Sequence, residues 1–355
     1  MAQAKRIGWI DLIRALGACA IVLLHVTVST FQTVDIDPVR KNTYILGGIV
    51  LCRWAVPAFF MVSGYLLLDP SRPFGWKRAW THARRMLLAL ATFGLAFSCL
   101  EEAAYYLSEG MRISGQLVID AAVDVLTGRT WDHLWYVYAL MFVYLLIPLL
   151  ELLRSRFGER GLTVLMGVLF AGVLVVPTAL DIGATAQVLS WPGQLGSWRN
   201  EIWWSTLIGL ANVLVGNYLR GASRTRLIAA LGVVALVAML ALSSWGLASG
   251  WGSMSFVYMH ESFLPTLYAA GLIVVMRHLR GDEPLPERSL AQVLAQDSFG
   301  IYVIHPLFVH VALMAMDPIA WPPVVYECTF FVVVTAASVA ATRVLRHVPF
   351  VGRLL

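Results

Sequence analysis

Ten apolar stretches, each about as long as a helix needs to cross a lipid bilayer, follow one another along this chain. A spanning helix takes about 20 mostly apolar residues, because each residue advances about 1.5 Å through a hydrocarbon core about 30 Å thick. Only 13% of the residues are charged, which is about half the fraction in a soluble domain. The sequence therefore predicts an all-α polytopic transmembrane helical bundle. Its predicted spans are 7–29, 44–68, 84–107, 133–153, 161–180, 201–219, 226–247, 256–277, 296–316 and 323–344.

The basic residues are distributed unequally between the two sides that these spans define. One side receives 19 of the 26 Lys and Arg residues and the other receives 5, while Arg14 and Arg53 lie within spans. Cytoplasmic loops carry the excess of basic residues, so both termini are predicted to be cytoplasmic. The loops are short and no basic domain is present. We therefore expect residues 1–355 to form a single integral membrane domain, with no appended soluble domain and no nucleic-acid partner.

The four cysteines do not indicate a disulfide framework or a metal site. All of them lie within apolar runs, where a thiol is typical of a small packing residue. We expect no bound metal. These residues are Cys19, Cys52, Cys99 and Cys328.

The first span, "RIGWIDLIRALGACAIVLLHV", contains three ionisable side chains: Asp11, Arg14 and His25. In a helix of 3.6 residues per turn, His25 lies about three turns and 20° beyond Arg14, roughly 16 Å along the axis, and Asp11 lies within about 60° of the same line. Asp11 and Arg14 could be present without a functional role, because an arginine near a helix end can extend to the headgroups at the inner interface and pair there with the aspartate. This interpretation does not explain His25, and ionisable residues deep in a span usually mark function. We interpret the three as one functional polar stripe.

Polar residues in later spans are candidates of the same kind. Ser298, Tyr302 and His305 share one face of the ninth predicted span, although packing alone can also account for Tyr and His in a core. Arg53 lies inside the second span and needs a carboxylate, a carbonyl or a ligand oxygen. Ser63, with the glycine that follows it, permits close helix approach, and Arg53 and Ser63 are both candidates for substrate binding.

The rims of the bundle provide two further groups of candidates. Five basic residues on the predicted cytoplasmic rim are explained by orientation or by phosphate binding: Arg72, Lys77, Arg78, Arg84 and Arg85. On the outer side, aromatic residues can belong to an interfacial belt or stack on a sugar, and Glu261 can bind a sugar hydroxyl or pair with Arg53 or Arg199. The outer group consists of His133, Trp135, Tyr136 and Glu261.

Several segments together resemble the membrane acyltransferase-3 family. Arg14 and His25 have the spacing of its first-span motif, and "RWAVPAFFMVSGYLLL", "HLWYVYALMFVYLLIPLL" and "DSFGIYVIHPLF" are similar to three later signatures in the right order. The third of these four resembles the surface polysaccharide O-acetyltransferase branch, the group like the enterobacterial common antigen O-acetyltransferase. Many relatives carry Arg-x-x-Arg entering the third span. Here that stretch is "WTHARRMLL", which leaves open whether Arg84 or Arg85 has the family role.

The resemblance implies a multi-pass enzyme of the bacterial inner membrane that moves an acetyl or other short acyl group from acetyl-CoA to a sugar hydroxyl of an exported or lipid-linked glycan. Acyl transfer needs a base, a donor to the developing oxyanion and exclusion of water. His25 suits the base, or an acylated relay, because imidazole titrates near neutrality. Asp11 would orient Arg14, which would hold the donor's phosphate or thioester oxygen, and Tyr302 with His305 would assist. Membrane lipid and a second copy of the chain are further expected partners.

Two other functions are alternatives to acyl transfer. The buried Asp11, Arg14 and His25 could instead form the proton relay or headgroup site of a transporter for a lipid-linked saccharide, although no internal repeat supports this. A scaffold without activity would leave these buried charges without a purpose.

Overall fold

The computed structural model describes residues 6–33, 37–185, 201–250, 254–316 and 321–355. Within these ranges the chain is helical and contains no β-strand. The first half comprises α1 (Gly8–Thr33), α2 (Pro38–Tyr44), η1 (Ile45–Val50), α3 (Ala55–Leu67), α4 (Trp76–Ala89), η2 (Leu90–Gly94), α5 (Leu95–Ser108), α6 (Gln116–Thr127), η3 (Asp132–Leu134) and α7 (Trp135–Leu169). The second half comprises η4 (Phe170–Val175), α8 (Val176–Thr185), α10 (Glu201–Gly221), α11 (Thr225–Ala248), α12 (Ser255–Tyr258), α13 (Phe263–Arg280), α14 (Leu290–Ala315), α15 (Pro323–Leu345) and η5 (Val351–Arg353).

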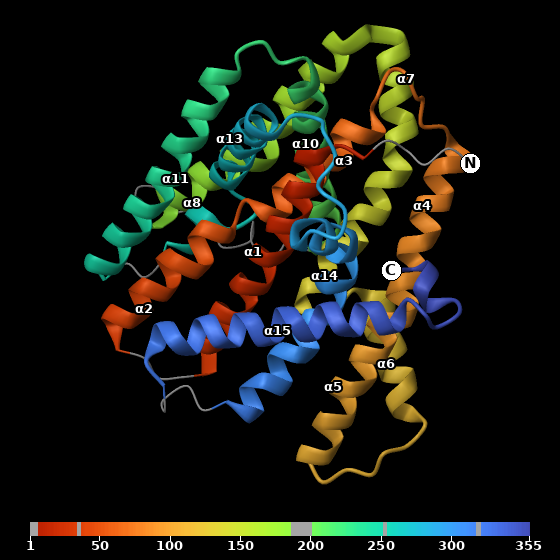
Figure 1. The fold of residues 1–355 in the computed structure, drawn as a ribbon, viewed down its shortest axis with the longest axis vertical. Helices are drawn as coiled ribbons and strands as arrows, with labels where there is room; N and C mark the ends of the chain where they lie inside the picture. Colours follow the sequence, from red (N-terminus) through yellow and green to blue (C-terminus); the bar gives the residue numbers. More distant parts are fainter. Residues whose placement is uncertain (1–5, 34–36, 186–200, 251–253, 317–320) are drawn as a thin grey trace.

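Nine helices in the described part of the chain are long and apolar enough to cross a membrane, and they account for all ten predicted spans. One of them, Trp135–Asp181, has 47 residues and would be about 70 Å long if straight, more than twice the hydrocarbon thickness. The backbone leaves the helical conformation at Gly158, with φ 63° and ψ −168°. Figure 1 shows the chain reversing direction there. The spans predicted at 133–153 and 161–180 therefore lie on either side of Gly158.

Helix α1 lies near the centre of the bundle, where it contacts α3, α13, α14 and α15. Helix α10 packs against both α3 and α7, α4 packs against α7, and α11 packs against α13. Helices α5 and α6 form a hairpin that extends from the lower end of the bundle in Figure 1. The polar stripe of the first span is thus carried by a helix with protein around it.

Close contact between α3 and α10 depends on glycine. A Cβ atom added at Gly64 would lie 1.9 Å from the carbonyl oxygen of Val213, and one at Gly216 would lie 1.9 Å from that of Met61. Only glycine lets the two backbones approach this closely. The predicted role of the Ser63-Gly64 pair in close helix packing is confirmed for the glycine.

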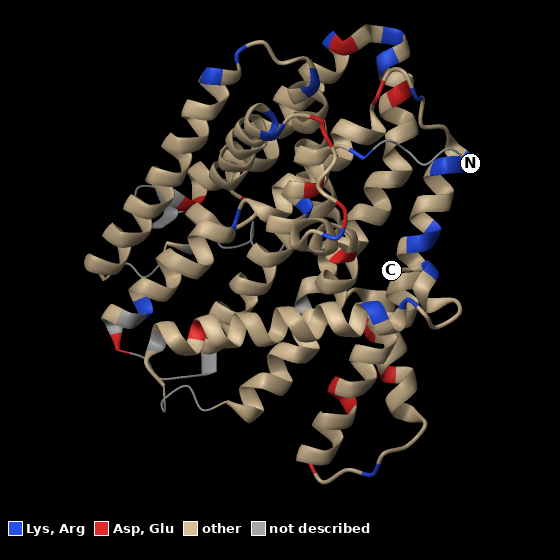
Figure 2. Ribbon diagram, in the orientation of Figure 1, with Lys and Arg blue, Asp and Glu red and all other residues tan. Residues whose placement is uncertain are grey.

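Lys and Arg residues are concentrated toward the upper end of Figure 2, at the start of α4, at the turn within α7 and before α11. Acidic residues lie on α5 and α6 at the lower end of the view, and others lie in its upper half. This distribution follows the asymmetry counted in the sequence. The cytoplasmic placement of the termini stays a prediction, and the upper end is called inner below on that basis.

Candidate active site

An outer cavity of about 600 Å³ brings together most of the residues predicted for catalysis and acceptor binding. Its walls come from α1, the break before α3, the start of α7, α10, the break before α13, and α14. The predicted residues that line it are His25, Arg53, His133, Trp135, Tyr136, Glu261 and Tyr302.

An inner cavity of about 270 Å³ lies toward the N-terminal half of α1. Arg14 and Arg85 supply its positive charge. Ser63 also lines this inner cavity rather than the outer one, where acceptor-binding residues were expected. Its hydroxyl donates to the Phe59 carbonyl within α3 at 2.9 Å. Sequence reasoning missed two further polar residues of this cavity, Tyr144 and Gln296.

The two cavities meet at a pair of tyrosines. Tyr136 and Tyr302 line both of them, and their ring centroids are 5.3 Å apart. Arg14 faces one side of this pair and His25 faces the other. The polar stripe on α1 therefore runs from the inner cavity to the outer cavity, and the rings of Tyr136 and Tyr302 form the wall between the two.

Three histidines from three segments form a cluster at this wall. The ring centroids of His25 and His305 are 4.9 Å apart, those of His133 and His305 are 5.6 Å apart, and those of His25 and His133 are 6.4 Å apart. The sequence pointed to each residue separately, but it gave no signal that they meet. We call His25, His133 and His305 the histidine cluster.

Pro306 explains how the His305 ring is held. Proline has no backbone N–H, so the carbonyl of Tyr302, four residues earlier, lacks its usual helical donor. The Nδ1 atom of His305 lies 2.8 Å from that carbonyl oxygen and 3.0 Å from the carbonyl oxygen of Ile301. Carbonyls only accept, so Nδ1 carries the hydrogen and Nε2 of the neutral ring carries the lone pair. Nε2 is buried and has no hydrogen-bond partner among the described residues. Its lone pair is therefore not engaged by another protein group, as a general base requires.

His133 and Tyr302 are each held by a hydrogen bond to a backbone carbonyl. Nε2 of His133 lies 3.2 Å from the Val303 carbonyl oxygen, so it donates and leaves the lone pair on Nδ1. The hydroxyl of Tyr302 donates to the His133 carbonyl. These bonds tie η3, just before α7, to α14 and fix both rings in place.

Asp11 and Arg14 form the ion pair that the stripe predicted. The Arg14 Nη1 atom is 3.8 Å from Asp11 Oδ1, and Arg6 approaches the other oxygen at 4.0 Å. Asp11 is buried while Arg14 remains partly exposed and lines the inner cavity. Asp11 can therefore orient Arg14 without itself reaching that cavity.

Irregular backbone carries the charged residues of the outer cavity. Arg53 lies in a turn just before α3, and His260 and Glu261 lie in the break between α12 and α13. Arg53 lies over the Tyr258 ring, 5.6 Å from its centroid, and its buried Nε has no hydrogen-bond partner in the part of the chain described. Non-helical backbone at membrane depth is tolerated where it lines a cavity. Arg199, the other predicted partner of Glu261, lies outside the described residues.

Trp135 keeps only part of its ring available to a ligand. Its indole stacks on the His260 imidazole with centroids 4.2 Å apart and an interplanar angle of 19°. Both residues line the outer cavity. Sequence reasoning did not assign His260 to this site, because the residue that it stacks on lies on a different span.

Of the five basic rim residues predicted to bind the acyl donor, only Arg85 lines the inner cavity. Arg85 lines the inner cavity, and its Nε and Nη2 donate to the carbonyls of Leu354 and Leu355 at 3.0 and 3.1 Å. Arg84 and Arg85 are both exposed, but only Arg85 lines the inner cavity, so Arg85 is the arginine that shares this cavity with Arg14. The remaining rim residues are also exposed: Arg72, Lys77 and Arg78.

Asp297 is a buried carboxylate that the motif comparison did not single out. It is 1% exposed, and its oxygens pair with Arg343 at 3.1 Å and with Arg346 at 2.5 Å. These bonds join α14 to α15 one turn before the segment that carries Tyr302 and His305. Asp297 lines neither the inner nor the outer cavity, and we interpret it as a structural link between the two helices.

The described chain is an all-helical membrane bundle with a histidine cluster beside two adjoining cavities, an arrangement that suits a membrane-bound protein that transfers a group. The model of a family described as "Acyltransferase domain" matches residues 7–343, nearly the whole chain. The chain therefore belongs to the acyltransferase-3 family and is a multi-pass membrane acyltransferase. No curated protein and no solved structure matches it significantly. The transporter alternative is not favoured by this membership.

Proposed function

We propose that this protein is an O-acetyltransferase of the bacterial inner membrane. It takes acetyl, or another short acyl group, from acetyl-CoA on the cytoplasmic side and transfers it to a sugar hydroxyl of an exported or lipid-linked surface glycan. The observation that carries the proposal is the meeting of the inner and outer cavities at Tyr136 and Tyr302. A donor and an acceptor can reach one wall from opposite sides of the membrane.

The inner cavity suits the thioester end of the donor. Arg14 and Arg85 line it, and an arginine guanidinium donates to phosphate or carbonyl oxygens without losing its charge. A volume of about 270 Å³ accommodates a pantetheine arm but not the whole of coenzyme A. The nucleotide end would then remain on the exposed basic rim formed by Arg72, Lys77, Arg78 and Arg84.

The histidine cluster provides the base. A lone pair on His25 or on Nε2 of His305 takes the proton of the sugar hydroxyl as its oxygen attacks the thioester carbon. The carbon–sulfur bond then breaks, and the proton passes to the departing sulfur, giving the acetyl ester and free coenzyme A. Arg14 would stabilise the negative charge that develops on the carbonyl oxygen.

The outer cavity suits a sugar. At about 600 Å³ it has room for one or two hexose rings, and its lining combines tryptophan faces with the charged groups of Arg53 and Glu261. Aromatic faces stack on the apolar side of a sugar ring, while charged groups accept and donate to its hydroxyls. The similarity to the polysaccharide branch seen in the sequence supports the same acceptor class.

Radiolabelled acetyl-CoA tests the proposal directly. Membranes containing the protein should transfer label to glycan, and His25→Ala should lower the rate by about 10²–10⁴-fold, the usual contribution of a general base. The matched control is His347→Ala, an exposed histidine outside both cavities, which should leave the rate unchanged. Undiminished labelling in the His25 variant would overturn the assigned chemistry, and an acetylated His25 recovered after denaturation would identify a relay instead of a base.

A further inference from the structure

Arg53 differs from the other arginines of the described chain in having no partner. Every other arginine there that is not exposed has a carboxylate or a backbone carbonyl beside its guanidinium: Arg14, Arg154, Arg220, Arg277, Arg280 and Arg346. Arg53 is not exposed either, yet it makes neither a hydrogen bond nor an ion pair with any described residue. Glu261, one of the partners expected for it, is not bonded to it.

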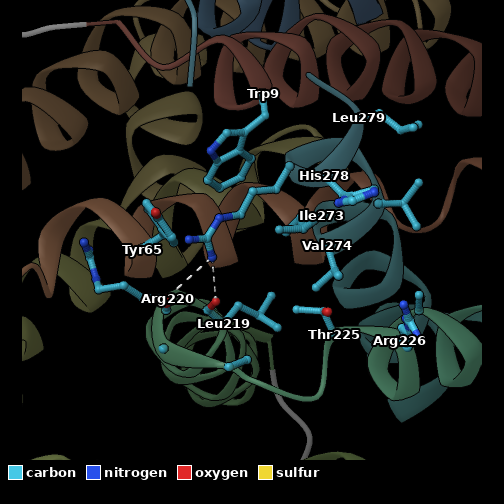
Figure 3. A pocket seen from close by; sticks show the side chains of 15 residues that line it. Trp9, Tyr65, Leu219, Arg220, Thr225, Arg226, Ile273, Val274, His278 and Leu279 are labelled. Carbon is cyan, nitrogen blue, oxygen red and sulfur yellow. Dashed lines mark hydrogen bonds between the residues drawn. The ribbon is translucent and has the colours of Figure 1, made fainter. Parts of the chain in front are cut away.

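A third cavity, of about 640 Å³, shows how the protein pairs such groups elsewhere. It lies at the inner ends of α10, α11 and α13, and Arg220 and Arg277 line it. Nη1 of Arg277 donates to the carbonyls of Leu219 and Arg220 at 3.0 and 3.5 Å, the two bonds drawn in Figure 3. Arg220 pairs with Asp69 at 3.4 Å. Both arginines are therefore paired within the protein.

The position of Arg53 makes its missing partner costly. It lies near the middle of the candidate span Lys41–Leu67, in the turn between η1 and α3. A charged side chain at this depth is rare and is found paired or facing a wet cavity. The Tyr258 ring, 5.6 Å from the guanidinium carbon, offsets only part of the charge. An anion in the adjoining cavity would offset the rest.

The free donors of Arg53 reach the outer cavity. Arg53 lines that cavity, and its Nε atom is buried and unpaired. The two Nη atoms are also unpaired among the described residues but are not buried, so they are the atoms that Arg53 presents to the cavity. Two Nη groups in one plane match the two oxygens of a carboxylate.

The other charges of the outer cavity favour an anion with a single charge. Arg129 and Glu261 line it together with Arg53, so the lining has one positive charge in excess. A sugar carboxylate carries one negative charge and would balance it. A phosphate monoester carries nearly two negative charges at neutral pH and would be repelled more strongly by Glu261.

We infer that the acceptor in the outer cavity is an acidic glycan and that Arg53 binds the carboxylate of one of its sugar residues. The inference rests on the proposed function, because it names the class of acceptor for that site. The phosphate of a lipid carrier lies among the headgroups, outside the hydrocarbon core. A negative charge that reaches Arg53 is therefore carried by the sugar itself. His25 lines the same cavity, so a carboxylate held at Arg53 would direct a nearby hydroxyl toward the histidine cluster.

Equilibrium binding to the purified full-length protein, without acetyl-CoA, tests the inference. The probes are cellobiouronic acid and cellobiose, which differ only in a carboxylate or a hydroxymethyl group on the terminal ring. The wild type should bind the acid about tenfold more tightly, the effect of one charged hydrogen-bonding group. Arg53→Gln should abolish this preference and leave the affinity for cellobiose near the wild-type value. Arg53→Lys keeps the charge without the planar fork and should retain part of the preference.

Two controls separate binding from folding. Arg112→Gln changes an exposed arginine on the predicted outer side that does not line the outer cavity, so both affinities should stay at the wild-type value. Arg53 has no hydrogen bond or ion pair to lose, so Arg53→Gln should not lower the melting temperature. Lost preference in a variant that melts normally is then a loss of recognition.

Equal wild-type affinity for the two probes, or a preference that survives in Arg53→Gln, would overturn the inference. Tighter binding of cellobiose 6′-phosphate than of cellobiouronic acid would overturn the assignment to a carboxylate. Acetyl transfer is measured separately with the same pair of probes. Equal labelling of both would leave the proposed function standing without an acidic acceptor, whereas binding selective for the acid without labelling of any glycan would contradict the proposed function alone.

Discussion

Replacing Pro306 by alanine should separate stability from activity in this protein. The new backbone N–H would bond to the Tyr302 carbonyl, as in a regular helix, and compete with Nδ1 of His305, which now lies 2.8 Å from that oxygen. His305 would keep its 3.0 Å bond to Ile301 and so retain its tautomer, but the ring would be held by one bond rather than two. We expect the position of Nε2 to become less defined.

The net change in stability should be small, because opposing effects nearly cancel. Alanine in place of proline in a helix interior favours folding by about 3 kcal/mol. Losing about two buried methylenes of the ring costs about 1.6 kcal/mol, and losing the side-chain hydrogen bond costs about 1 kcal/mol. The remainder is about 0.4 kcal/mol, so the melting temperature should stay within about 2 °C of the wild-type value.

Activity should respond differently. Loosening one hydrogen bond to a residue that takes or positions a proton should lower kcat by about tenfold, corresponding to about 1.4 kcal/mol at the transition state. Initial rates with radiolabelled acetyl-CoA and thermal melts on the same preparation provide the two measurements. Pro148→Ala, in the interior of α7 with no histidine beside it, is the control and should leave kcat nearly unchanged. Wild-type kcat in the Pro306 variant, or a loss of more than about 2 kcal/mol of stability, would refute the role assigned to the freed carbonyl.

Three further substitutions test the packing and the donor site. Gly64→Ala would place a carbon 1.9 Å from a carbonyl oxygen of α10, so we expect the free energy of unfolding to fall by about 3 kcal/mol. Gly167→Ala is the control: a Cβ there would have no atom within 4 Å, so thermal melts should show it to be neutral or slightly stabilising. Asp297→Asn should destabilise by about 2 kcal/mol, less than a fully buried pair because its arginines are partly exposed, and an unchanged melt would exclude that pair as a link between α14 and α15. Arg85→Gln should raise the KM for acetyl-CoA by about tenfold while Arg84→Gln leaves it near the wild-type value, and equal effects would contradict the placement of Arg85 alone at the inner cavity.

The sequence by itself determined the fold class and pointed to many of the residues that meet in the candidate site. Lipid cannot hydrogen-bond to the backbone, so each long apolar run had to be a helix, and hydropathy along one chain was sufficient to find it. Helical periodicity was also sufficient to place Asp11, Arg14 and His25 on one stripe, since three residues of one helix need no information from its neighbours. The ten predicted spans became nine candidate helices only because Gly158 interrupts one long helix without a loop.

The tertiary structure decided which of those residues meet. Hydropathy does not specify how helices rotate and pack against each other, because lipid and protein present similar apolar surfaces to a span. The meeting of His25 with His133 and His305, the position of Ser63 in the inner rather than the outer cavity, and the choice of Arg85 over Arg84 all depend on that packing. Close approach of backbones at Gly64 and hydrogen bonds between helices fix the rotations, and both arise only when residues distant in sequence are brought together.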